Sequence, residues 1–69
     1  MKYAARNKIA GKVIEIKKGG LMCEVVVKAS PELTVTSVIT LDSLNETGIR
    51  EGDTVTALVK AINVLLVKE

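Results

Sequence analysis

Apolar residues alternate with polar ones in the first part of the chain, a pattern that is typical of half-buried strands. Residues 8–17 follow this period of two as far as Val13, but Ile14 and Ile16 continue it on the other phase. A β-bulge at Val13–Ile14 accounts for the slip, and Gly11 marks a tight bend nearby. The pattern therefore predicts one strand, irregular in its middle, over residues 8–17.

Two further strands are predicted before the middle of the chain. Gly19 and Gly20 supply a turn, so residues 21–28 form the second strand of a hairpin. The residues expected on its inner face are Cys23, Val25 and Val27. A loop at residues 29–32 contains the only proline, and residues 34–40, rich in β-branched side chains, form the third strand.

Helix signals replace the strand pattern after residue 40. Thr40 is placed as an N-cap, Asp42 lies in the first turn and Gly48 follows as a C′ residue. A turn at residues 50–53 then leads to a fourth strand over 54–62 and a fifth over 64–68. The sequence predicts a single all-β domain over residues 1–69: a five-stranded OB-like barrel with a short helix between strands 3 and 4.

The last two predicted strands are apolar on both faces, although 69 residues offer little interior in which to bury them. With one cysteine and no histidine, the chain has neither an intrachain disulfide nor a structural zinc site to stabilise it. We therefore expect the second apolar face to contact another subunit.

Composition excludes several classes of function. Without histidine, and with Cys23 expected in the core, no activated nucleophile is evident, so an enzyme is not expected. The net charge of +2 and a single aromatic residue, Tyr3, argue against a nucleic-acid-binding OB module, which remains the alternative reading. No segment is apolar enough to span a membrane, and a free cysteine without an export signal favours the cytoplasm.

What the chain does supply is a set of donors for anions. Arg6 carries a planar fork of N–H groups, and Lys60 is a compact point charge in an apolar strand. Thr40 and Ser43 bracket the start of the predicted helix, where backbone N–H groups favour negative charge. Helix capping alone also explains these two hydroxyls, and spacing by itself favours that simpler reading.

Three segments together resemble the Mop, or molbindin, family. Residues 5–13 (ARNKIAGKV) are similar to its S-A-R-N-x-L-x-G-x-V opening, and residues 36–43 (TSVITLDS) to its T-S-I-I-x-x-D-S segment. Residues 44–52 and 55–61 continue the match, which covers essentially the whole chain. The three motifs occur in order at the length typical of the family.

The resemblance implies an OB-like subunit whose N-terminal strand is exchanged between partners in a hexamer, a trimer of dimers. It implies binding of molybdate or tungstate between subunits for intracellular molybdenum storage or homeostasis, with molybdenum held only as the oxyanion and no catalytic cofactor. By the same resemblance, Arg6 and Lys60 bind the anion, Ala61 offers a backbone amide, and Thr40 and Ser43 come from the neighbouring subunit. Ala4 stands where the family often has serine, so a hydroxyl is lost there while the backbone N–H remains.

Overall fold

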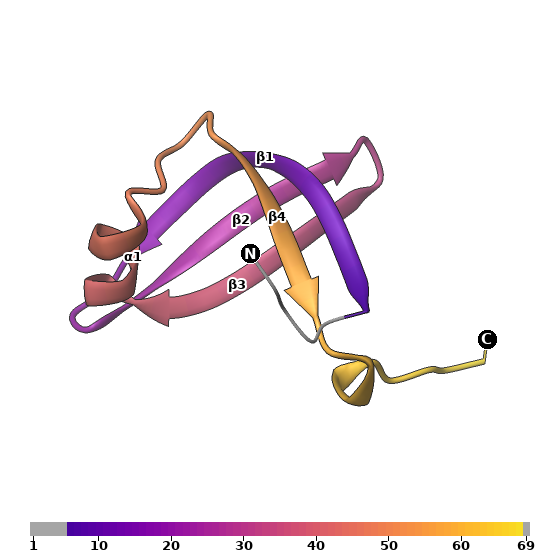
Figure 1. The fold of residues 1–69 in the computed structure, drawn as a ribbon. Coiled ribbons are helices and arrows are strands. Elements are labelled where there is room, and N and C mark those ends of the chain that lie inside the picture. Colours follow the sequence, from indigo (N-terminus) through magenta and orange to yellow (C-terminus); the bar gives the residue numbers. More distant parts are fainter. Residues whose placement is uncertain (1–5, 69) are drawn as a thin grey trace.

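Four antiparallel strands form one curled sheet in the computed structural model, which describes residues 6–68 (Figure 1). The elements in chain order are β1 (Asn7–Lys18), β2 (Met22–Ser30), β3 (Leu33–Thr40), α1 (Leu41–Thr47), β4 (Thr54–Val59) and the 3-10 helix η1 (Ala61–Asn63). The order of strands across the sheet is β3-β2-β1-β4. The predicted all-β, OB-like class with a short helix after the third strand is confirmed.

The long first strand is shared between two partners. Its first half pairs with β4 and its second half with β2, and the ladder with β2 shifts register between Val13 and Glu15. The predicted bulge at Ile14 is therefore present, and β1 arches over the sheet (Figure 1). Gly11 lies where the backbone passes close to β2, since a Cβ there would be 2.7 Å from the carbonyl oxygen of Lys28.

The core is small and lies under this arch. Its fully buried members are Val13, Cys23, Val25, Val27 and Leu44. The three inward residues predicted for the second strand are all among them, and Cys23, at 2% exposed, is a core residue. Leu44 reaches this core from α1, so the helix covers one end of the sheet.

The local signals around the helix are also confirmed. Thr40 is extended and accepts a hydrogen bond from the Ser43 backbone N–H, while Gly48 is left-handed with φ 70° and donates its N–H to the Leu44 carbonyl. The turn before β4 is held by Asp53, whose backbone N–H donates to the Arg50 carbonyl at 3.1 Å. Both ends of the helix are therefore fixed by the residues that predicted them.

The fifth strand was wrong for this chain. The strand β4 ends at Val59 rather than at residue 62, and residues 64–68 form no strand. A strand exists only where a neighbouring strand takes up its backbone hydrogen bonds, and η1 directs these residues away from the sheet (Figure 1).

An exchange of the N-terminal strand is not seen over the described residues. From Asn7 onward, β1 pairs with β4 of the same chain, from Asn7 opposite Val59 to Lys12 opposite Thr54. The expectation of exchange for residues 1–5 lies outside the described residues.

Candidate functional site

Two of the predicted anion-binding side chains meet at one end of the β1–β4 ladder. The last pair of this ladder is Asn7 opposite Val59, so Arg6 and Lys60 are the next residues on the two strands. Both are exposed, and neither forms an ion pair with any carboxylate among residues 6–68. The ladder therefore places two unneutralised cations side by side at an open end of the sheet.

The backbone after Lys60 adds a donor. Lys60 is the N-cap of η1 and accepts a hydrogen bond from the Asn63 N–H at 2.9 Å. Ala61 is the first residue of η1, so its own N–H is one of those that a helix start leaves without an intrahelical acceptor. Arg6, Lys60 and Ala61 thus form a cationic group, which we call the basic end. Ala4 lies outside the described residues.

Asn7 holds this end together and was missed at the level of sequence. Its side-chain amide donates to the Val59 carbonyl at 3.1 Å, which ties the start of β1 to the end of β4 directly beside Arg6 and Lys60. The available signal was its position after Arg6 in the ARN segment. Asn7 is a positioning residue for the basic end.

The two predicted hydroxyls meet at the start of α1, which we call the hydroxyl end. The Thr40 hydroxyl donates to Ser43 Oγ at 2.9 Å and accepts from the Ser43 backbone N–H at 3.0 Å. Thr40 therefore serves as the cap that the simpler reading required. Both residues are exposed, so the Ser43 hydroxyl keeps its own proton available for an outside acceptor.

The basic end and the hydroxyl end do not meet within one chain. Arg6 precedes the first residue of β1, whereas Thr40 pairs with Met22, next to the residue that pairs with Lys18 at the far end of β1. Figure 1 shows α1 and the start of β1 at opposite ends of the sheet. Eleven strand steps separate these ends, about 36 Å along the backbone. One chain therefore offers each half of the predicted site but not the whole.

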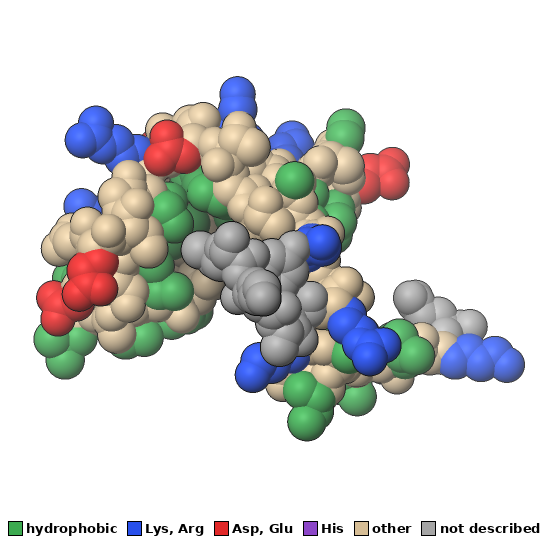
Figure 2. Space-filling model, viewed as in Figure 1, with side chains coloured by type: hydrophobic (Ala, Val, Ile, Leu, Met, Phe, Trp, Pro, Cys, Tyr) green, Lys and Arg blue, Asp and Glu red, His purple; other side chains and the backbone are tan. Residues whose placement is uncertain are grey.

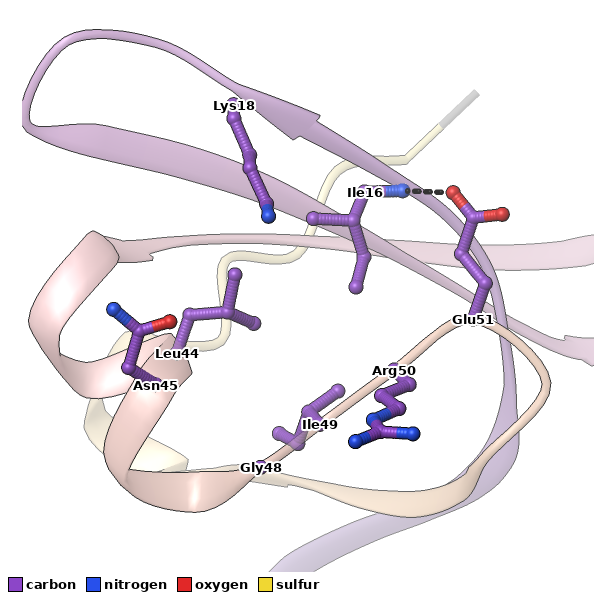
Figure 3. A pocket seen from close by; sticks show the side chains of 8 residues that line it. All are labelled: Ile16, Lys18, Leu44, Asn45, Gly48, Ile49, Arg50 and Glu51. Carbon is purple, nitrogen blue, oxygen red and sulfur yellow. Dashed lines mark hydrogen bonds between the residues drawn. The ribbon is translucent and has the colours of Figure 1, made fainter.

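A separate hollow of about 450 Å³ lies between the end of β1, α1 and the loop that follows the helix. Figure 3 shows Lys18 entering it from β1 and Arg50 from the loop, above apolar side chains such as Ile49. Its carboxylate, Glu51, accepts a hydrogen bond from the Ile16 N–H at 3.1 Å. None of the predicted site residues lines this hollow.

An apolar groove of about 400 Å³ separates the two edge strands, β3 and β4. Valines of β2 form part of its lining, and β3 and β4 line its two sides. Ser43 is the one predicted site residue beside it. The groove marks the place where the sheet does not close into a barrel.

The described residues show no sign of two other kinds of site. Residues 6–68 contain no group of three or more acidic, cysteine or histidine side chains placed to hold a metal ion. No helix in that range is long and apolar enough to cross a membrane. Figure 2 shows lysine and arginine side chains gathered where the C-terminal tail leaves the sheet, which is the side of the basic end.

Comparison with known proteins places this geometry in a family. Residues 4–66 match the family model described as TOBE domain. Molybdenum-pterin-binding protein 2 of Clostridium pasteurianum is 42% identical over 66 residues, which cover 96% of this chain and 97% of that protein. The solved structure of a molybdate binding protein from Sporomusa ovata has a TM-score of 0.91 and 38% identity, with 99% of this chain and 100% of that chain covered.

A third similarity is to part of a larger protein. The cytoplasmic molybdate-binding protein ModG, solved with molybdate bound, has a TM-score of 0.82 and 30% identity over 88% of this chain and 43% of its own. The family match spans nearly all of the chain, and both the sequence relative and the Sporomusa structure are matched over almost their full length. The chain belongs to the TOBE domain family and, within it, to the Mop group that its three sequence motifs resemble.

Proposed function

We propose that this protein binds molybdate or tungstate, as the intact oxyanion, between subunits of a homo-oligomer. The observation that carries the proposal is the separation of the two donor groups. The basic end has Arg6, Lys60 and the Ala61 N–H, and the hydroxyl end has Thr40 and Ser43. A site assembled from one end of each of two copies would contain all of them, together with the Ala4 backbone N–H.

The chemistry of these donors suits a tetrahedral dianion. Molybdate presents only acceptor oxygens, while guanidinium, ammonium and backbone N–H groups only donate. Hydrogen phosphate carries an O–H that would find no acceptor in such a site, so the site would discriminate against it. The N–H groups of η1 and the paired cations also favour negative charge without a metal ligand from the protein.

The similar proteins support the same ligand. Molybdate binding is stated in the names of the Sporomusa protein and of ModG, and the latter was solved with the anion in place. ModG is described as cytoplasmic, which accords with a cytoplasmic role for this chain in molybdenum storage or homeostasis. We propose a hexamer of this kind, a trimer of dimers, acting as a binding protein rather than an enzyme and without a nucleic-acid or membrane partner.

Calorimetric titration tests the ligand. Molybdate and tungstate should bind with saturable heat, sulfate much more weakly, and a single-stranded oligonucleotide should give no gel shift. Binding of the oligonucleotide with no heat from either metal oxyanion would overturn the proposal in favour of the nucleic-acid module. For the storage role, elemental analysis of protein purified from molybdate-supplemented cells should find molybdenum that survives gel filtration.

A further inference from the structure

The C-terminal segment, residues 62–67, is the largest apolar feature of the described chain that has no partner. Ile62, Leu65 and Leu66 are 86–88% exposed, and Val67 is 78% exposed. Single apolar side chains on a surface are ordinary, but a contiguous exposed run of this kind marks a contact surface. Figure 2 shows hydrophobic side chains along this tail, clear of the main body.

The apolar groove between β3 and β4 has the complementary defect. Both strands are edges of the sheet, so each presents unpaired backbone groups there. The groove walls include Val35 and Ile39 on β3 and Val55 and Val59 on β4. A closed OB-like barrel needs one more strand between these two edges, and the chain has one segment with the apolar pattern of a strand left over.

The lengths agree as well. The groove is lined by five consecutive residues of β4, from Val55 to Val59. Five residues of the tail, 64–68, span about 17 Å when extended, the same length as five residues of β4. Val64 is already extended, with φ −93° and ψ 119°.

The geometry of η1 disfavours closure by the chain's own tail. Its two hydrogen bonds, from Asn63 N–H to the Lys60 carbonyl and from Val64 N–H to the Ala61 carbonyl, turn the backbone outward after β4. The tail then runs away from the groove (Figure 1). Return into its own groove would require a reversal of direction across the residues that η1 holds.

We propose that the groove between β3 and β4 receives the C-terminal segment of a second copy of this chain, which adds as the missing strand. The exchanged element is thus the C-terminal segment, not the part of β1 that pairs within its own chain. This inference rests on the proposed homo-oligomer and names the contact that builds it. It does not depend on the anion.

Disulfide trapping tests the contact. One chain carries Leu66→Cys and a mass tag, and a second carries Ser37→Cys on β3 or Thr56→Cys on β4, both of which line the groove. After the two are unfolded and refolded together, mild oxidation should link the tagged chain to the untagged one. Glu24→Cys, an exposed position on β2 that does not line the groove, is the matched control and should link far less. Cys23 is buried and stays in place, with Leu66→Cys alone as the background.

The outcomes separate this inference from the function. If Ser37→Cys/Leu66→Cys in one chain oxidises only within that chain, the tail closes its own barrel and the inference fails. If light scattering shows an oligomer but no groove position links to Leu66→Cys, the inference fails while the proposed assembly stands. A folded monomer overturns both, whatever the molybdate titration shows.

A second measurement uses an uncrosslinked protein. Leu66→Asp should shift light scattering toward the monomer, whereas Lys68→Asp, which places the same acid outside the apolar run, should keep the oligomer. Far-UV circular dichroism reports whether each variant retains its sheet. If removal of residues 1–5 abolishes the assembly and Leu66→Asp does not, the groove belongs to the N-terminus of a partner and the proposal is overturned.

Discussion

At the scale of single residues, Lys60 and Arg6 are neighbours without an ion-pair partner among the described carboxylates. Hydrogen bonds to charged groups contribute about 1.5–3 kcal/mol each. Lys60→Ala should therefore weaken molybdate binding roughly 10- to 150-fold, and Arg6→Ala should cost at least as much because its fork binds two oxygens at once. Calorimetric titration measures both losses.

Lys12→Ala provides the control for charge. Lys12 is an exposed lysine in the middle of β1, remote from the end at Asn7, and its removal changes the net charge equally. Molybdate affinity within about twofold of the parent for Lys60→Ala, far short of the loss of a charged hydrogen bond, would contradict the assignment of the basic end.

Thr40 and Ser43 separate capping from ligand binding. Thr40→Ala removes the acceptor for the Ser43 N–H, so it should lower the free energy of unfolding by about 1 kcal/mol as well as weaken molybdate binding. Ser43→Ala keeps that cap, so unfolding should change little while affinity falls by roughly tenfold. Thermal unfolding at fixed protein concentration, combined with titration, distinguishes the two. Unchanged affinity in Ser43→Ala would mean that the pair only caps the helix.

At the scale of elements, the crossing of β1 over β2 depends on Gly11. A Cβ at this position would be 2.7 Å from both the Lys28 carbonyl oxygen and Val27 Cγ1, and neither backbone nor buried valine yields easily. Gly11→Ala should destabilise the fold by about 1–3 kcal/mol, the usual cost of overpacking.

Gly20→Ala is the matched control for that prediction. A Cβ at Gly20 meets nothing within 4 Å, and its φ is not in the left-handed region. Denaturant unfolding of the two variants should show a large loss for Gly11→Ala and almost none for Gly20→Ala. Equal effects would mean that flexibility of glycine, rather than close approach, accounts for the loss.

The elements that could be predicted from sequence are those whose signals are local. The bulge at Ile14 follows from a slip in the side-chain alternation, and the helix from a cap at Thr40 and a left-handed glycine at Gly48. Residues 64–68 carry an equally clear strand pattern, but a strand also requires a partner edge, and the local sequence does not say which edge is available.

The candidate site divides in the same way. Arg6, Lys60, Thr40 and Ser43 could be named from motifs and donor chemistry, and the register of β1 with β4 brings the first two together. Their separation from the two hydroxyls follows from the three-dimensional course of β1, which alternation does not reveal. Asn7 was missed because its contact with Val59 is also a product of register.

At the scale of the whole molecule, a ligand that binds only the folded assembly stabilises it by mass action. At a free molybdate concentration 100 times the dissociation constant, the gain is about 2.7 kcal/mol per site. The melting temperature should therefore rise with molybdate, and the rise should be greater at higher protein concentration. Scanning calorimetry with equal concentrations of sulfate is the comparison. The same melting temperature in both anions at every protein concentration would count against a site between subunits.

The placement of the two half-sites at opposite ends of β1 also fixes a stoichiometry. Each copy has one basic end to give and one hydroxyl end to receive it. In a closed symmetric assembly every such surface is used once, whether two copies reciprocate or several form a ring. The number of complete sites then equals the number of chains and does not depend on the size of the assembly. An assembly left open would keep one vacant half at each of its two free ends, so capacity would report closure directly.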